Sequence, residues 1–238
     1  MNETLKILRD RKSVRVYTDE PITAEEKNAI LSAALRAPTA GNMMLYSILD
    51  ITDQNIKDAL AKTCDNQPFI AKAPMVLVFC ADYRRWMRKF AACGCGNGDP
   101  VKPEEGNLLL ACNDTIIAAQ TAVIAAESLG IGSCYIGDVL EQCETHIELL
   151  NLPEYVVPVS MVVFGHPTEG QKNRKQLPRE PLKHIVFENG YRDLNDEELQ
   201  EFSKQTNIIP FYERKHSSDF MKEMNRSSRA WITHWLNK

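Results

Sequence analysis

The stretch RKSVRVY, residues 11–17, alternates polar and apolar side chains with the period of two that is typical of an extended segment. One face of such a segment would carry Arg11, Ser13 and Arg15, and the opposite face would be apolar. A guanidinium group offers a planar fork of donors that suits phosphate oxygens, and a serine hydroxyl adds a short donor between two of them. Taken alone, the stretch is either an anion cradle or a solvated basic patch.

Length and composition describe an ordinary globular chain. Its 238 residues suit one large domain or two small ones, with a sizeable core. A net charge of −4 argues against a protein that binds nucleic acid over a broad basic surface. The polar start, residues 1–4, has no apolar run of a signal peptide, and seven cysteines are an odd number. We therefore expect reduced thiols and a cytoplasmic location.

Residues 108–129 form the one long apolar run of the sequence. The run contains Asn113, Asp114, Gln120 and Glu127, so we do not expect it to span a membrane. A helix that is apolar on most faces is buried from several sides, and this one would lie at the centre of a domain or of a dimer. For Asp114 we expect a hydrogen bond in helix packing or at an interface rather than catalysis.

Helical and strand signals alternate along the chain, without an internal repeat. Thr23 and Glu26 have the spacing of a capping box, which predicts a helix that begins there and ends before Pro38. Apolar runs favour buried strands, one of them in spite of Pro158. The pattern predicts helices over residues 3–10, 24–36, 54–62, 108–129 and 140–150, and strands over 46–51, 74–80, 133–136 and 156–164.

The last 50 or so residues are more charged than the rest. Residues 217–237 place Phe220, Met224, Trp231 and Trp235 along one helical stripe. Two tryptophans on a terminal helix have to be buried, either on their own domain or on a second subunit. The pattern alone leaves both alternatives open.

Two loops carry further chemistry. APTAGN, residues 37–42, offers backbone donors, a hydroxyl and an amide between a helix and a strand. GIGSCYIG, residues 130–137, follows the long apolar helix, and its glycines permit a close backbone approach to a flat ligand. This string is not the dinucleotide fingerprint, because there the glycines follow a strand and open a helix.

These three segments, together with Gln67-Pro68-Phe69 and with Ala73-Pro74 leading into residues 76–82, resemble the FMN-dependent nitroreductase family over residues 5–190. The layout looks most like its branch of NAD(P)H-linked flavin and nitro reductases. The resemblance implies an α+β fold with a mixed central sheet flanked by helices. It also implies an intertwined homodimer with FMN at the interface. Residues 1–190 would form the FMN-binding domain, and residues 191–238 a helical extension that packs on its own or on the partner subunit.

The resemblance also implies roles for particular residues. Arg11 and Ser13, with Lys12 beside them, match the positions that hold the FMN phosphate. Arg15 matches the basic residue at the N1–C2 edge of the flavin, where a fixed cation stabilises the reduced, anionic ring. The other implied contacts are the loop presented to the partner's flavin (Pro38, Thr39, Ala40, Asn42), a polar contact to the ring or ribityl chain (Gln67), the backbone against the ring face (Tyr135, Ile136, Gly137), and a second basic contact near the phosphate (Arg179, with Lys175 as a helper).

The chain departs from the family pattern in two places. Family members often carry Gln-Pro-Trp after the Asn loop, where this chain has Met44, Leu45 and Tyr46, so a side-chain hydrogen bond is lost. Leu177 stands where a lysine usually precedes the second basic contact. The phosphate would then depend more on Arg11.

The implied reaction is hydride transfer from NAD(P)H through flavin N5 to a small acceptor such as a nitroaromatic, a quinone or a flavin. Both substrates would share one site, which predicts ping-pong kinetics, and the cofactor carries the reactivity. One alternative is a protein of the same fold with a different reaction, either reductive dehalogenation or an oxygen-dependent flavin reaction. Others are a flavin-binding redox sensor that uses Cys93 and Cys95, and a flavin-free structural dimer. The five histidines show no spacing that would complete a metal site with these cysteines, so mobile loop thiols are the preferred interpretation, and we expect no metal.

Overall fold

The computed structural model describes residues 1–204 and 206–237. A four-stranded sheet lies at its centre, in the order β1-β2-β4-β3. Every neighbouring pair of these strands is antiparallel. The strands are β1 (Tyr46–Asp50), β2 (Met75–Asp82), β3 (Gly132–Ile136) and β4 (Val156–Gly165).

The two inner strands, β2 and β4, are buried on both faces, as their continuous apolar sequences predict. Pro158 lies inside β4, where its ring removes a ladder donor. The register shifts at this point, because Phe79 pairs with Ser160 while Cys80 pairs with Pro158. Such a bulge lets an inner strand accommodate a proline.

Helices follow the strands along the chain, and α2 begins at the capping box of Thr23 and Glu26, as predicted. The α-helices are α1 (Glu3–Asp10), α2 (Ala24–Ala34), α3 (Gln54–Thr63), α4 (Pro68–Ala71), α5 (Arg84–Ala92), α6 (Glu105–Ser128), α7 (Cys143–Leu150), α8 (Glu169–Lys172), α9 (Asp196–Glu201), α10 (Ile208–Lys215) and α11 (Asp219–Leu236). Short 3₁₀ turns are η1 (Ala40–Asn42), η2 (Cys95–Gly98), η3 (Gly137–Leu140) and η4 (Leu182–His184).

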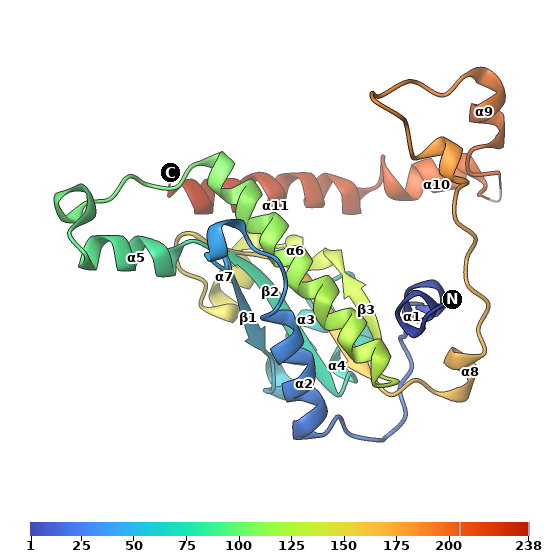
Figure 1. Ribbon diagram of the computed structural model, residues 1–238, viewed down its shortest axis with the longest axis horizontal. Helices are drawn as coiled ribbons and strands as arrows, with labels where there is room; N and C mark the ends of the chain where they lie inside the picture. Colours follow the sequence, from blue (N-terminus) through green and yellow to red (C-terminus); the bar gives the residue numbers. More distant parts are fainter. Residues whose placement is uncertain (205, 238) are drawn as a thin grey trace. The chain divides into compact units, whose positions relative to one another are not determined.

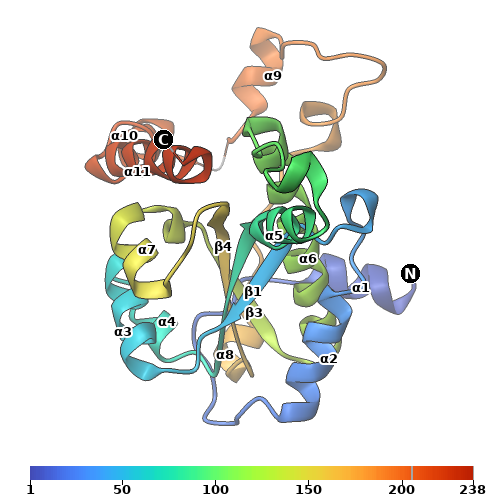
Figure 2. The same ribbon diagram turned by 90° about the vertical axis from the view of Figure 1, so that its left-hand side faces the viewer.

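Helices cover both faces of the sheet (Figures 1 and 2). On one face, Leu77 and Phe79 of β2 pack with α2 and α6. On the other face, Val76 and Val78 of the same strand pack in a second cluster, to which α3, α4 and α7 contribute. Alternate side chains of β2 therefore belong to two separate hydrophobic cores, one on each face of the sheet.

Helix α6 has a length and a mean hydropathy of 1.6 that would also fit a membrane span. Its inner face packs against the sheet through small residues, with Asp114 and Thr115 among them. Its outer face is exposed in the single chain, with Leu109 at 66% and Ile116 at 42%. The predicted central helix is therefore confirmed on one side, and its other side offers an apolar surface.

The α+β fold is confirmed, with one correction to the predicted mixed sheet. Among the described residues, the only parallel pairing is an isolated bridge between Ser13 and Ser133. The four strands themselves pair antiparallel. Apolar runs predict burial on both faces but not direction, and that is why the sequence did not give the orientation of the strands.

The chain forms two compact units, one of residues 1–174 and 224–237 and one of residues 175–223. The sequence predicted a division at residue 190. That functional division stays a prediction, whereas the compact units separate after Arg174 and again after Glu223.

The end of α11 packs on its own subunit, within the first unit. Trp235 is fully buried, and its ring meets Tyr83 and Tyr155 edge-on. Its Nε1 donates to the carbonyl of Glu104 at 3.3 Å, and Trp231 Nε1 donates to the carbonyl of Leu140 at 3.0 Å. Both indoles thus have polar partners at the edge of an apolar core.

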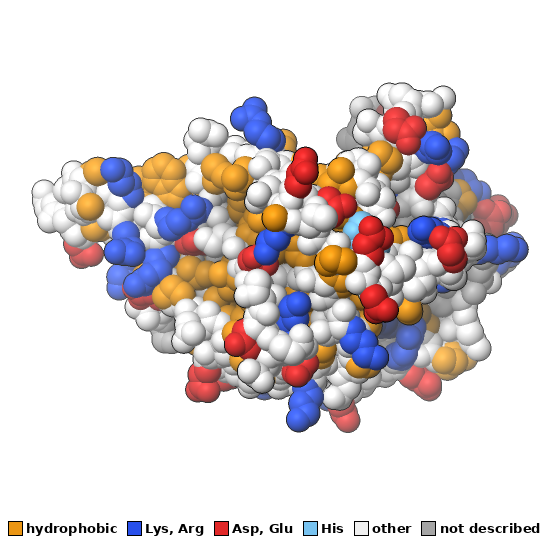
Figure 3. Space-filling view, turned by 90° about the horizontal axis from the view of Figure 1, so that it is seen from below, with side chains coloured by type: hydrophobic (Ala, Val, Ile, Leu, Met, Phe, Trp, Pro, Cys, Tyr) orange, Lys and Arg blue, Asp and Glu red, His pale blue; other side chains and the backbone are white. Residues whose placement is uncertain are grey.

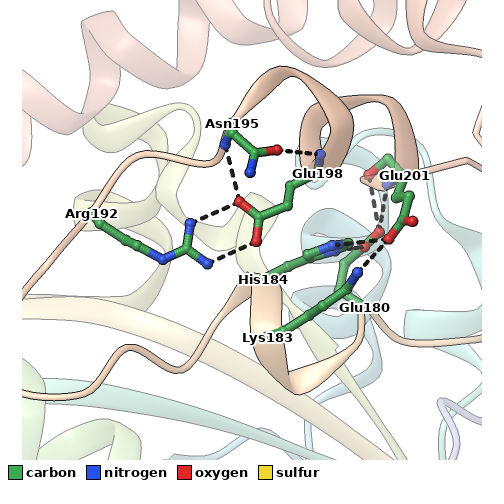
Figure 4. Close-up of polar contacts among 8 residues, drawn as sticks. Glu180, Lys183, His184, Arg192, Asn195, Glu198 and Glu201 are labelled. Atoms are coloured by element: carbon green, nitrogen blue, oxygen red, sulfur yellow. Dashed lines mark hydrogen bonds and ion pairs between the residues drawn. The ribbon is translucent and has the colours of Figure 1, made fainter.

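The second unit is held together by polar contacts (Figure 4). Arg192 forms a bidentate pair with Glu198 at 2.7 and 2.8 Å, and this holds the pKa of that carboxyl down at about 2. The buried His184 lies 3.1 Å from Glu180. Many large apolar side chains of the unit remain exposed: Leu177, Leu182, Ile185, Val186, Tyr191, Leu199, Ile208, Ile209, Phe211 and Tyr212.

Candidate active site

The RKSVRVY segment lies along the outer edge of β3. The Val14 amide donates to the carbonyl of Ser133 at 2.8 Å, and Val14 is only 4% exposed. Gly132 makes this contact possible, because a Cβ there would lie 2.4 Å from Val14 Cγ2. A Cβ on Gly165 would likewise lie 2.5 Å from the ring of Tyr17. Two glycines therefore let the segment run directly against the sheet.

The predicted two-faced pattern holds at Val14 but is wrong at Val16. Val16 is 53% exposed, and the next residue, Tyr17, packs inward in its place. The Tyr17 hydroxyl donates to the carbonyl of Val14 at 3.2 Å. Because Tyr17 and not Val16 packs inward, the period of two ends at Val14.

Residues 171–174 lie beside the basic segment. Lys12 Nζ donates to the carbonyls of Lys172 and Arg174 at 2.7 and 2.9 Å. The guanidinium of Arg174 donates to the carbonyl of Ser13, and the amide of Arg15 donates to Gln171 Oε1 at 3.3 Å. Arg174 thus joins the cationic edge that residues 11–15 form.

Sequence reasoning missed Arg174. The signal available was the basic run of residues 172–175 after the last strand, but nothing local connects it with a segment 160 residues earlier. The ammonium of Lys12 ties the two segments together, and its predicted contribution to FMN binding stays a prediction.

Two polar groups of β3, the Cys134 thiol and the Ser133 hydroxyl, lie beside the cationic edge. Burial raises the pKa of the Cys134 thiol, while Arg15 and Ser13 act in the opposite direction. The Ser133 hydroxyl is fully buried and, among the described residues, has no hydrogen-bond partner. Arg15 also lies over the ring of Phe69, at 5.8 Å from its centroid. Cations, hydroxyls and an aromatic face are the donors and surface that a phosphorylated, flat cofactor needs, so these residues fit FMN.

Glu127, near the end of α6, faces the same edge. Burial raises the pKa of its carboxyl to about 7, although the positive charges of Arg11 and Lys12 lower it. Its Oε1 is buried without a partner among the described residues. A carboxyl that is partly protonated near neutral pH adds less negative charge beside an anion site than a fully ionised one.

The segment GIGSCYIG provides β3 and the turn after it. Ile136 is buried, and the Tyr135 hydroxyl donates to Gln120 Oε1 at 3.3 Å. Nothing would meet a Cβ on Gly137 within 4 Å, so open space adjoins the backbone there. Gln67 Nε2 donates to Asp138 Oδ2 at 2.6 Å and joins the start of α4 to this turn. Gln67, Tyr135, Ile136 and Gly137 thus belong to one region, as the resemblance implied.

The loop of residues 38–45 leads from the end of α2 into β1. It contains Pro38, Thr39, Ala40 and Asn42, and it forms the turn η1. Three donors of this loop, on Thr39, Ala40 and Leu45, bond to the carboxylate of Asp114. The expectation that Asp114 makes a packing hydrogen bond is confirmed.

Lys175 and Arg179 belong to the second unit, where Arg179 lines a cavity of about 530 Å³ together with His184 and Glu201. Their contact with the FMN phosphate stays a prediction.

Cys93 and Cys95 are exposed free thiols at the end of α5. Gly94 and Gly96 between and after them have positive φ values and open space around them. Over the described residues, no group of three or more potential ligands could hold a metal ion. Sequence reasoning did not predict α5, whose basic side chains form part of the cluster of Lys and Arg at the left end of Figure 3.

The α+β fold and this edge fit an oxidoreductase that binds a phosphorylated flavin. Residues 8–166 match the model of the nitroreductase family, and the chain belongs to that family. It is 35% identical over 236 residues to FMN reductase (NAD(P)H) of Bacillus subtilis, covering 97% of this chain and 88% of that protein. It is 31% identical over 246 residues to the oxygen-insensitive NADPH nitroreductase of Salmonella typhimurium, covering 100% and 98%.

A solved structure agrees with these relatives. The NADPH:FMN oxidoreductase of Vibrio harveyi, complexed with NAD⁺, superimposes with a TM-score of 0.80 at 29% identity, covering 95% of this chain and 98% of that one. The predictions of an enzyme of the oxidoreductase class, with FMN as cofactor and NAD(P)H as electron donor, are therefore confirmed.

Gly132→Ala tests whether the basic segment depends on the close approach at β3. We expect a loss of about 1–3 kcal/mol in the free energy of unfolding, because the new methyl group overpacks Val14. FMN affinity should fall as well, since Ser13 and Arg15 would move with the backbone. Urea unfolding and FMN titration measure the two effects. Gly106→Ala in α6, where nothing lies within 4 Å of the added Cβ, is the matched control and should not lower stability. Equal behaviour of the two variants would contradict the argument.

Glu127 predicts a pH dependence of stability. Its pKa is about 7 in the folded chain against 4.5 for an unperturbed carboxyl, so the folded protein holds the proton more tightly. The stabilisation is complete below pH 4.5 and is lost as the pH rises through 7. In Glu127→Gln, the free energy of unfolding should fall less than in the wild type over this range. Urea unfolding between about pH 4.5 and pH 8 measures this, and parallel profiles would show that Glu127 ionises normally.

Proposed function

We propose that this protein is an FMN-dependent reductase that takes hydride from NAD(P)H and passes the electrons to a small acceptor in ping-pong order. Nitroaromatics, quinones and free flavin are the acceptor classes. The names of the relatives support reduction of flavins and nitro compounds. When bound, FMN supplies the two-electron chemistry at its N5.

The observation that carries the proposal is the cationic edge along β3. Arg174 donates to the carbonyl of Ser13, and Arg11 and Arg15 both act to lower the pKa of the Cys134 thiol, with Arg15 also over the ring of Phe69. We propose that Arg11, Ser13 and Arg174 hold the FMN phosphate. No carboxylate among the described residues forms an ion pair with Arg15. Its charge is therefore available to stabilise negative charge at the N1–C2 edge of a reduced ring. Hydride transfer then needs no nucleophile or base from the chain.

We also propose an intertwined homodimer with one FMN at each interface. Support comes from the apolar outer face of α6, where Leu109, Leu110, Ile116 and Ile117 are exposed, and from the many exposed apolar side chains of the second unit. Pro38, Thr39, Ala40 and Asn42 would then face the flavin bound by the partner subunit. The free cysteines support a cytoplasmic location.

A redox sensor remains the second candidate, because Cys93 and Cys95 are both exposed and free on one loop. In a sensor, NAD(P)H would bleach bound flavin slowly and oxidants would crosslink the two thiols. In a reductase, bleaching would be rapid, and Cys93→Ser with Cys95→Ser would leave its rate unchanged.

The visible spectrum of the purified protein tests the proposal directly. Oxidised-flavin bands should appear with the protein and should vanish within seconds of adding NADPH or NADH under anaerobic conditions, and the faster donor is the preferred one. Bands that persist would shift the function toward another reductant or a sensor. A protein that stays colourless after FMN is added would falsify the proposal.

Two substitutions separate the proposed roles within the basic segment. Arg15→Ala should slow flavin reduction more than it weakens FMN binding, because it removes the charge beside the reduced ring. Arg11→Ala should weaken binding more than it slows reduction, because it removes a phosphate contact. We expect roughly 10- to 100-fold effects on the affected quantity, from the loss of a charge-assisted hydrogen bond. Stopped-flow reduction and FMN titration give the two numbers, and effects of both variants on affinity alone would contradict the assignment.

A further inference from the structure

We propose that Asp114 is a positioning residue: its buried carboxylate, rather than the cofactor, fixes the 38–45 loop in the form that meets the flavin. The inference rests on the proposed function, which makes this loop a wall of the flavin site. It adds a residue that never touches the flavin in that proposal and acts through the loop alone.

The loop directs its donors inward, to one carboxylate. The Thr39 hydroxyl donates to Asp114 Oδ2, the Ala40 amide donates to Oδ1 at 2.9 Å, and the Leu45 amide donates to Oδ2 at 3.2 Å. The Thr39 hydroxyl also accepts from the Met44 amide at 2.8 Å. Both ends of the loop are thereby tied to a single side chain.

Asp114 is only 3% exposed, on the face of α6 that packs against the sheet. Among the buried residues that the structure describes in α6, Asp114 alone carries a charge. A buried carboxylate is tolerated only when donors surround it. An amide of the same shape has one acceptor oxygen and would turn its NH₂ group toward a backbone donor. All three contacts therefore require two acceptor oxygens, which a carboxylate has and an amide lacks.

The carbonyls of the loop are held from the other side by α5. Arg85 Nη2 donates to the carbonyls of Met44 and Tyr46 at 2.7 and 2.6 Å. Trp86 Nε1 donates to the carbonyl of Met43 at 2.7 Å. Asp114 thus accepts hydrogen bonds from the loop, and side chains of α5 donate hydrogen bonds to the carbonyls of the loop and of Tyr46.

The backbone of the loop shows why such support is needed. Asn42 and Met44 have φ values of 58° and 51°, in the left-handed region that side chains with a Cβ rarely occupy. Residues keep such a backbone conformation when several neighbouring groups hold them in it. Here the hydrogen bonds from α5 and α6 hold the loop, so it has this conformation before a flavin binds.

The experiment compares Asp114→Asn with Thr115→Val. Thr115 is the next residue of α6 and is fully buried, but its hydroxyl bonds only to the carbonyl of Ala111, one turn back in the same helix. Thr115→Val therefore costs a buried hydrogen bond without touching the loop. Hydrogen exchange of the Ala40, Met44 and Leu45 amides is measured without FMN, and the FMN dissociation constant is then measured by titration.

In Asp114→Asn we expect these amides to exchange at least about tenfold faster than in the wild type, and the FMN dissociation constant to rise about 10- to 100-fold. Thr115→Val should lower the melting temperature and leave both quantities near their wild-type values. If the two variants lose stability alike and keep protected loop amides and FMN affinity, Asp114 is an ordinary structural residue and the inference is wrong.

The loop side gives an independent test, which also serves if Asp114→Asn does not fold. Thr39→Val keeps the shape and removes the hydroxyl that joins Asp114 to the Met44 amide, so this amide should exchange faster than in the wild type. Thr39→Ser keeps the hydroxyl and should restore most of the protection. Equal protection in Val and Ser variants would overturn the inference. Because exchange is read without FMN, a chain that binds no flavin would defeat the proposed function and still decide the role of Asp114.

Discussion

The carboxylate of Asp114, buried between a helix and a loop, is the interaction on which the site depends. A charge on the inner face of α6 would be costly if it were unpaired, and three donors from the 38–45 loop make it tolerable. The same contacts place β1, because Leu45 directly precedes it. One side chain thus links the central helix, a strained loop and the edge strand of the sheet. Its partners lie about 70 residues earlier in the chain, so the contact also joins two segments that are distant in the sequence.

A second constraint acts at the opposite edge of the sheet. The basic segment can follow β3 because Gly132 and Gly165 have no side chain where Val14 and Tyr17 approach. The backbone contact fixes the direction in which Ser13 and Arg15 project, and Lys12 and Arg174 tie the segment to the end of α8. The cationic edge is held by the fold and not by the attraction of its charges, which repel one another. An anion placed there would relieve that repulsion, so folding and binding favour the same arrangement.

Local signals were enough for much of the fold. The capping box at Thr23 and the apolar runs of β2 and β4 depend on neighbouring residues, and they predicted their elements correctly. The sequence also marked Asp114 and the glycines of residues 130–137, but it could not name their partners, because contacts between distant segments leave no local pattern. The glycines were predicted to admit a flat ligand, and at Gly132 the close neighbour is Val14. Helix α5, RRWMRKFAA, was missed because no capping side chain marks its start and its first turn carries no acidic residue. Its importance lies in Arg85 and Trp86, whose acceptors are carbonyls that any sequence would provide.

The second unit leaves much of its apolar surface exposed in the single chain. Its ion pair between Lys183 and Glu201 joins two exposed side chains, and such a pair contributes little to stability. It buries few of its own apolar residues, while Ile209 and Tyr191 are 72% and 84% exposed. A segment of this composition gains most by covering apolar surface elsewhere, and the outer face of α6 shows that this chain also carries such surface uncovered. In the homodimer proposed above, two copies would satisfy both needs at once. In that arrangement, a loop already fixed by Asp114 would need no rearrangement to contact a flavin bound by the other copy. Neither association nor cofactor binding would then have to supply the free energy for ordering the loop.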